Sequence, residues 1–144
     1  MVTIKTLCDK DAQIAIAAIR DELGKRGKAA VIAVADCHGE TIALLRMHGA
    51  ALSSAVVAAN KAYSSARLRR PSGEVGRRSR HPDTGFDIAY YGDSRYTGWG
   101  GGLPVRTGGE VIGAVAVSGL TDVEDEELSA LGIAAIMASL DPAG

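Results

Sequence analysis

The chain has 144 residues, of which 47% are hydrophobic, and a net charge of −1. This length suits one domain with a substantial core, and the balanced charge argues against nucleic acid or a membrane as a partner. No apolar run approaches the ~20 residues that span a bilayer. The N-terminus lacks the pattern of a signal peptide, and the two cysteines are too few for a disulfide framework or a zinc site. We therefore expect a cytoplasmic protein with reduced thiols.

The N-terminal part of the chain predicts a helix followed by a β-hairpin. Residues 6–26 are amphipathic, with Thr6 as the expected N-cap. Residues 29–35 form a continuous apolar run, which is typical of a strand buried on both faces. A turn at 36–39 contains Asp and Gly, and residues 41–47 provide the return strand.

A second helix is predicted from Ser53 to about Leu68. Its many alanines indicate a closely packed face. Asn60 and Lys61 are the side chains in it with chemistry to offer. A helical lysine is usually solvated, and Lys61 could act as a base only if burial removed its proton.

The segment 67–99 differs from the rest of the chain in composition. Its glycines and prolines predict irregular structure. Arginine binds carboxylates through paired hydrogen bonds, so arginines beside aromatic rings favour an anionic, unsaturated ligand. A solvated face and a salt-bridge network between subunits are the alternatives. The residues concerned are Arg67, Arg69, Arg70, Arg77, Arg78 and Arg80, followed by Phe86, Tyr90, Tyr91, Tyr96 and Trp99.

Three consecutive glycines, Gly100, Gly101 and Gly102, precede a proline, a polar turn and the β-branched run 111–119. That run predicts a central strand. Glycines allow a ligand to approach backbone N–H groups, although a plain hairpin would also explain them. A last helix, capped by Thr121 or Asp122, places its acidic residues at the positive end of the helix dipole. Hairpins rather than crossovers join the strands, which predicts an α+β fold with an antiparallel sheet flanked by helices.

Four segments, taken in order, resemble the GlcG/HbpS family, also called the haem-binding-protein-like family. The resemblance covers most of the chain. It is carried by residues 34–39 (VADCHG) with 46–50 (RMHGA), by Ser53 with 60–63 (NKAY), by 100–104 (GGGLP), and by 109–119 (GEVIGAVAVSG) with Asp125-Glu126.

The resemblance implies a single profilin-like domain over residues 1–144 and a homo-oligomer, built from dimers and extending up to an octamer. Some members bind haem. Others belong to catabolic pathways, and some act on small unsaturated acids, including hydrolytic dehalogenation of a muconate-type substrate. Segment 67–99 is more basic here than is usual in the family, which argues against a simple haem-binding role.

Our leading hypothesis is therefore an enzyme acting on a small muconate-like carboxylate, by hydrolytic dehalogenation or tautomerisation, without a cofactor. Arginines would bind the carboxylates, backbone N–H groups would stabilise an enolate, an aromatic ring would cover the substrate, and a base would move a proton. The expected substrate-binding residues are Arg46, Asn60, Arg67, Arg69, Arg70, Phe86, Trp99, Gly100, Gly101, Gly102 and Ser118. The expected bases are His38, His48, Lys61 and His81.

Two alternatives belong to other classes of function. A haem-binding or haem-handling protein would use His38, His48, His81 or a methionine as axial ligand and arginines for the propionates. A non-catalytic oligomeric scaffold that binds a small ligand would need none of these.

Overall fold

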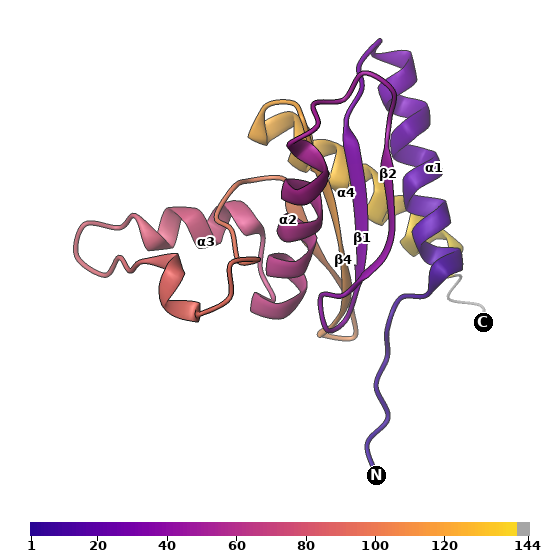
Figure 1. Cartoon of the computed structure of the whole chain (residues 1–144). Coiled ribbons are helices and arrows are strands. Elements are labelled where there is room, and N and C mark those ends of the chain that lie inside the picture. The colour runs from indigo at the N-terminus through magenta and orange to yellow at the C-terminus, as the bar shows by residue number, and fades with distance from the viewer. Residues whose placement is uncertain (141–144) are drawn as a thin grey trace.

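The computed structural model describes residues 1–140 and confirms the α+β fold (Figure 1). Residues 141–144 of the single domain predicted over 1–144 lie outside the described residues. The elements are α1 (Asp9–Lys25), β1 (Val31–Asp36), β2 (Thr41–Arg46), α2 (Ser54–Leu68), α3 (Ser72–Ser79), the 3-10 helix η1 (Ile88–Tyr91), β3 (Gly102–Thr107), β4 (Glu110–Ser118) and α4 (Asp122–Ser139). None of the described helices is long and apolar enough to cross a membrane.

The sheet has four strands in the order β2-β1-β4-β3, and every neighbouring pair is antiparallel. The predicted hairpin is confirmed as β1 and β2, and the predicted central strand is β4. The glycine stretch is not entirely a loop, because Gly102 is the first residue of β3. Pro104 lies on this edge strand, where a residue without an N–H group is tolerated.

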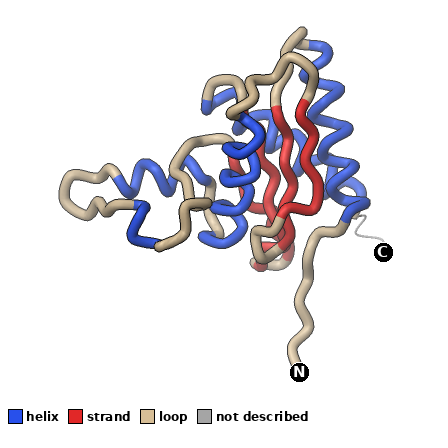
Figure 2. The backbone as a smooth tube through the Cα atoms, in the orientation of Figure 1, coloured by secondary structure: helices blue, strands red, loops and turns tan. Residues whose placement is uncertain are grey.

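Helices cover both faces of the sheet (Figure 2), with α1 and α4 on one face and α2 on the other. The central strand β1 contributes buried side chains to both faces of the sheet, as its continuous apolar sequence predicts. Ile32 and Val34 pack with α1 and α4, while Val31, Ala33 and Ala35 face α2. This alternation is the two-residue period of a strand.

Helix α2 packs closely on the sheet because the contact consists of small side chains. Ala58, Ala62 and Ala66 meet Ala114 and Ala116 of β4. Alanine keeps the helix near the strands and retains full helix propensity. The predicted closely packed face of this helix is therefore present.

The first helix begins at Asp9 rather than at residue 6, so the predicted N-cap Thr6 is wrong. Leu7 donates its N–H to the carbonyl of Ile112 at 2.8 Å, which keeps the preceding segment extended along the sheet. Cys8 is the N-cap, and its N–H binds the Asp11 carboxylate at 2.8 Å. The Thr6 hydroxyl instead accepts the N–H of Cys37 at 3.0 Å.

Segment 67–99 is not wholly irregular, because it contains α3 and η1. It forms an arm that projects from the sandwich, at the left of Figure 1. The glycines of α3 serve packing instead of ending the helix. A Cβ atom on Gly76 would lie 2.2 Å from the carbonyl oxygen of Gly98, and one on Gly73 would lie 3.2 Å from Cα of Gly100. Long-range contact therefore accounts for glycines that local rules interpret as helix breakers.

A buried ion pair ties α2 to α4. Lys61 Nζ lies 3.0 Å from Asp125 Oδ2 and donates to the carbonyl of Val117 at 3.0 Å. The two side chains are only 2% and 1% exposed. Burial raises the pKa of the Asp125 carboxyl, and the charge of Lys61 opposes that shift. Asp125 thus has a role that helix-dipole complementarity alone does not explain.

Replacing Lys61 with Met should lower the free energy of unfolding by about 3–5 kcal/mol, because it leaves a carboxylate buried without its cation. Urea unfolding measures this change. The double variant Lys61→Met/Asp125→Asn should recover part of the loss, since no buried charge remains. A Lys61→Met protein within about 1 kcal/mol of the parent would contradict a structural role for the pair.

Candidate functional site

Two hollows meet at Arg69 and Arg106, which line both of them. The first, of about 550 Å³, also includes Arg70, Leu103 and Ile133. The second has a volume of about 490 Å³. It is bounded by the N-terminal segment, by Cys37 and His38 of the β1–β2 turn, and by the β3–β4 turn. We call the pair the Arg69–Arg106 groove.

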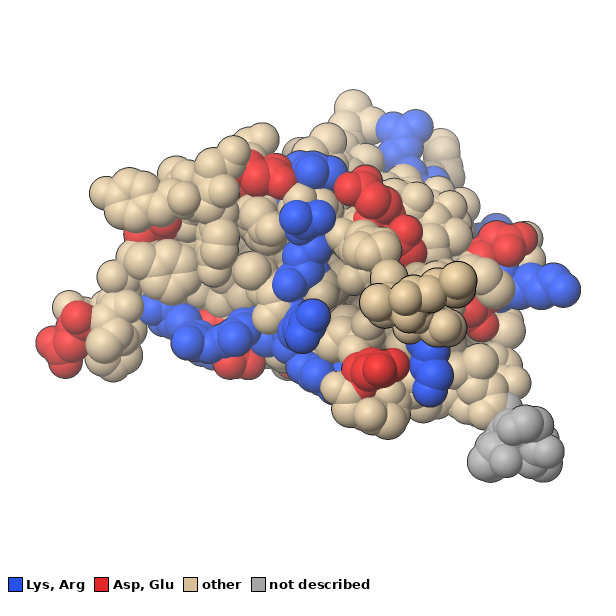
Figure 3. Space-filling model, turned by 90° about the horizontal axis from the view of Figure 1, so that it is seen from below, with Lys and Arg blue, Asp and Glu red and all other residues tan. Residues whose placement is uncertain are grey.

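The groove is basic. Its lining contains four cationic side chains and two carboxylates, namely Lys5, Arg69, Arg70 and Arg106 against Glu74 and Glu110. Glu74 lies 3.7 Å from Arg70, which leaves Arg69 and Arg106 as the central charges. Figure 3 views the molecule from the lower end of the sheet and shows lysine and arginine side chains gathered in a band across that face. Such a surface suits an anionic ligand.

Arg69 has an unusual backbone conformation for a residue that carries a side chain. It terminates α2 with φ 58° and ψ 38°, in the left-handed region that glycine normally occupies. It is the single non-glycine residue with positive φ in the described chain, 1–140. Its carbonyl accepts a hydrogen bond from the Arg106 guanidinium. An arginine here costs about 1 kcal/mol or more, which is typical of a position under functional constraint.

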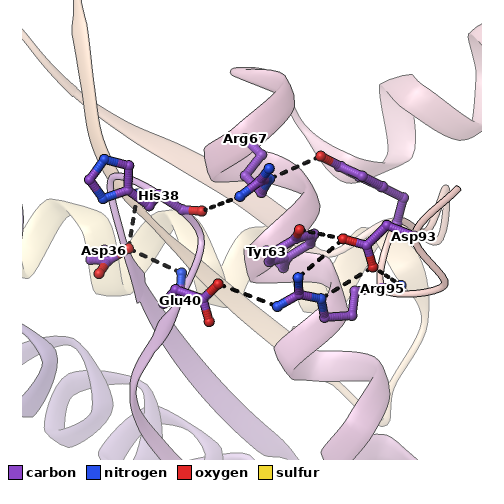
Figure 4. A network of polar contacts seen from close by, with 8 residues as sticks. Asp36, His38, Glu40, Tyr63, Arg67, Asp93 and Arg95 are labelled. Atoms are coloured by element: carbon purple, nitrogen blue, oxygen red, sulfur yellow. Dashed lines mark hydrogen bonds and ion pairs between the residues drawn. The ribbon is translucent and has the colours of Figure 1, made fainter. Parts of the chain in front are cut away.

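The turn that carries His38 is fixed from two sides. The Asp36 carboxylate accepts the N–H groups of His38 at 2.9 Å and Glu40 at 3.0 Å. Arg67 of α2 donates to the His38 carbonyl at 3.3 Å. Gly39 closes the turn with φ +87°, and a Cβ there would lie 2.9 Å from Cγ of Arg67. Figure 4 shows the imidazole pointing away from α2 while the backbone faces it.

A polar network continues from this turn into the arm (Figure 4). Arg95 donates to both carboxylate oxygens of Asp93 at 3.2 Å and lies 3.3 Å from Glu40. The Tyr63 hydroxyl donates to Asp93 at 2.5 Å. Hydrogen bonds from Arg95 and Tyr63 hold the pKa of Asp93 well below its usual range. Burial, with this hydrogen bond, raises the pKa of Tyr63 to about 12. The network therefore anchors the arm to the turn of His38.

The three histidines differ in whether a ring nitrogen is available. His81 Nδ1 accepts the N–H groups of Asp83 at 3.1 Å and Thr84 at 3.2 Å, so the neutral ring carries its proton on Nε2. His38 Nδ1 lies 3.7 Å from Cys37 Sγ. A proton on that nitrogen would leave Nε2 with a free lone pair. His48 is exposed in the turn after β2 and lines neither hollow of the groove.

Gly100, Gly101 and Gly102 do not line the groove. The Gly100 N–H donates to Asp122 at 3.2 Å, and the Gly102 N–H donates to the Ser72 hydroxyl at 2.9 Å. Gly100 lines a separate hollow of about 470 Å³ between α3 and α4. Two of the three N–H groups expected to stabilise an enolate therefore already have partners within the chain.

The other predicted site residues are dispersed. Arg67, Arg69 and Arg70 lie near the end of α2, where Arg69 and Arg70 line the groove and Arg67 supports the His38 turn. The rest lie elsewhere: Arg46 exposed on β2, Asn60 half-buried on α2, Lys61 buried in its ion pair, Phe86 and Trp99 exposed on the arm, Gly101 buried beside Lys61, and Ser118 buried at the end of β4.

Sequence reasoning did not single out Arg106, Cys37 or the pair Asp93 and Arg95. Arg106 follows an irregularity in the pairing of β3 with β4, between Val105 and Arg106. A single polar residue in an edge strand gives little local signal, because exposed strand positions are commonly polar. Cys37 belongs to the motif 34–39, but the sequence predicts no site role for its thiol, although it adjoins His38.

The family model that matches the chain covers residues 7–134 and is described as "Haem degrading protein HbpS-like". This chain belongs to the HbpS-like family. The predicted resemblance to GlcG/HbpS proteins is therefore confirmed.

Individual relatives agree with this assignment. Protein GlcG of Escherichia coli K12 is 36% identical over 118 residues, covering 82% of this chain and 85% of GlcG. Protein ORFY of Klebsiella pneumoniae has a TM-score of 0.89 and 30% identity, covering 96% of this chain and 95% of ORFY. A double mutant of HbpS from Streptomyces reticuli has a TM-score of 0.81 and 25% identity, covering 93% of this chain and 89% of that HbpS chain. A PduOC–haem complex has the same fold, with a TM-score of 0.82 and 22% identity over 90% and 94%.

The leading hypothesis, an enzyme for dehalogenation or tautomerisation of a muconate-like carboxylate, is wrong. The matching family is described by haem degradation, and the solved neighbours include HbpS and a haem complex. These findings favour the alternative of a haem-binding or haem-handling protein. The basic composition of segment 67–99 argues against haem, but of the arginines in this segment only Arg69 and Arg70 line the groove.

The raised pKa of Tyr63 predicts a late-titrating phenol. Its pKa rises from 10.0 to about 12 in the folded chain, so its contribution to stability is present below pH 10 and disappears as the pH rises towards 12. Tyrosinate absorbance of the parent minus that of Tyr63→Phe should show one phenol with a midpoint of about 12. A difference curve centred near pH 10 would contradict the buried hydrogen bond to Asp93.

Proposed function

We propose that this protein binds haem in the Arg69–Arg106 groove, with His38 as the axial ligand. One observation carries the proposal: an imidazole and two arginines line the same hollow of about 490 Å³. The family description and the names of the structural neighbours support haem as the ligand. The family description also names haem degradation, and we propose this activity for the chain as a second step after binding.

The chemistry of the groove fits the two ends of a haem. The propionates of haem are carboxylates, for which Arg69 and Arg106 provide guanidinium partners. The haem macrocycle is flat and apolar. Ile4 and Val111, which line the same hollow as His38, offer it apolar contact. Bound haem would supply an iron centre capable of redox chemistry. The chain would bind and orient it.

His38 is the histidine best arranged to ligate iron. A ligating histidine is normally oriented by a hydrogen bond from its other ring nitrogen, and here Cys37 Sγ lies beside Nδ1 at 3.7 Å. Asp36 and Arg67 fix the backbone on either side of the ring. His81 would have to give up two hydrogen bonds to place a lone pair on Nε2.

Titration with hemin tests the proposal directly. The parent should develop the Soret band of a ligated haem, and His38→Ala should weaken binding about tenfold or more and alter the band, because the axial bond is lost. His81→Ala is the matched control and should bind like the parent. Equal spectra and affinities for the parent and His38→Ala would contradict the assignment of the ligand.

The arginine contribution is tested in the same titration with Arg69→Gly. Glycine adopts φ 58° without strain, so the free energy of unfolding should stay within about 1 kcal/mol of the parent. Hemin affinity should nevertheless fall about tenfold, since a charge-assisted hydrogen bond is lost. Arg46→Gly is the control, because Arg46 is exposed on β2 and lies outside the groove. The hemin affinity of this variant should equal that of the parent.

We also propose that the protein is a homo-oligomer, in keeping with the predicted dimer-based assembly, and that it resides in the cytoplasm. Leu52, in the turn before α2, and Val56, in the first turn of the helix, are 75% and 67% exposed. Two large apolar side chains four positions apart in the sequence, left in water, favour a protein contact. Both cysteines, Cys8 and Cys37, are free thiols, which supports a reducing compartment.

Light scattering tests the assembly. Val56→Lys should lower the mass of the oligomer, because a charge in an apolar contact is left without a partner. Gln13→Lys, on the exposed face of α1, is the control and should keep the mass of the parent. A monomeric parent would contradict the proposed assembly, and an unchanged mass for Val56→Lys would contradict this surface.

A further inference from the structure

The arm carries a small hollow, at η1, that the haem proposal does not use. It has a volume of about 280 Å³ and is lined by Phe86, Asp87, Tyr90 and Tyr91. Three of these four residues are aromatic, and the fourth is a carboxylate. We call them the aromatic cage.

The geometry of the cage provides two walls at a right angle. The rings of Phe86 and Tyr91 have centroids 6.0 Å apart and an interplanar angle of 84°. Phe86 and Tyr91 are 39% and 45% exposed, and Tyr90 is 86% exposed, so a ligand can reach all three. Aromatic faces around a space of this kind attract cations through the negative potential above each ring.

The carboxylate supplies the matching charge. Asp87 is the sole charged residue that lines the cage, and its Oδ1 accepts the N–H of Ala89 at 2.9 Å. This bond caps η1 and fixes the carboxylate beside the rings. Arg70 and Arg78 line a neighbouring hollow shared with Phe86 and Tyr91. Both arginines lie within 4.0 Å of the single carboxylate of Glu74, which offsets part of their repulsion of a cationic ligand.

The cage is also held in place before any ligand arrives. Phe86 donates its N–H to the carbonyl of Ser79 at 2.9 Å, and Tyr90 donates to that of Asp87 at 3.0 Å. Tyr91 stacks on Tyr96 with centroids 4.6 Å apart. The backbone of the cage and the Tyr91 ring therefore need little ordering on binding, which favours affinity.

We propose that the aromatic cage binds a quaternary ammonium group. An ordinary ammonium has three N–H donors and a guanidinium has five, and one carboxylate cannot satisfy them all. A trimethylammonium group has no N–H donors and presents weakly hydrated methyl groups to the ring faces. Aromatic rings and one carboxylate therefore supply all the interactions that it needs. The site is independent of haem binding.

Choline titrated into the 144-residue chain tests this assignment. Its methyl proton resonances should shift upfield through the ring currents of the cage, and the shift should saturate. The neutral isostere, in which carbon replaces the ammonium nitrogen, should bind at least about tenfold more weakly, because the cation–π attraction and the Asp87 charge are absent. Equal binding of the two probes, or no saturable shift, would overturn the proposal.

Two variants locate the site. Asp87→Asn keeps an oxygen that can cap η1 and removes the charge, so choline affinity should fall about three- to fivefold. Tyr90→Ala removes an exposed ring and should weaken binding to a similar extent. Trp99→Ala removes another exposed ring of the arm, 61% exposed and outside the cage, and should bind choline like the parent. Loss of binding in Trp99→Ala alone would overturn the assignment. A peptide with a trimethyl-lysine distinguishes a group carried by a protein from a free small molecule. If the natural ligand is carried by a protein, the peptide should bind more tightly than choline.

Discussion

The contact between Lys61 and Asp125 fixes the relation of the two helical layers. These residues lie 64 positions apart, on helices that cover opposite faces of the sheet, and their charged atoms are 3.0 Å apart in a dry environment. The same ammonium group binds the end of β4 through Val117. A Cβ atom on Gly101 would lie 2.9 Å from it, so the glycine stretch is required by this junction. The glycines that first suggested a ligand site are therefore part of the framework.

Helix α2 links the Lys61–Asp125 contact to the groove. Close alanine packing and the Lys61 anchor hold the helix, and Arg67 and Arg69 project from its last turn. Arg67 then fixes the His38 turn, while Arg69 meets Arg106 at the centre of the basic surface. The αL conformation of Arg69 is difficult to explain by helix termination alone, because glycine would perform that role without strain. The proposed contact of its guanidinium with a haem propionate would account for an arginine at this position.

The fold was largely predictable from sequence, whereas the site was not. Strand β1 and the amphipathic helices have local patterns that determine their faces. Helix α3 was missed because Gly76 is needed for contact with Gly98, which no local rule detects. Lys61 resembled a solvated lysine because its partner is distant in sequence. The difference between His38 and His81 depends on which backbone N–H groups reach each ring. Adjacent arginines and aromatics predict one site, yet Arg69 lines the groove while the aromatic cage is a separate hollow at η1.

The most direct test of the account is the position of iron in crystals of the hemin complex, located by the anomalous X-ray scattering of the metal. The account predicts iron bonded to Nε2 of His38 and propionates at Arg69 and Arg106. Iron bonded to His48 or His81, or held in the hollow between α3 and α4, would contradict it.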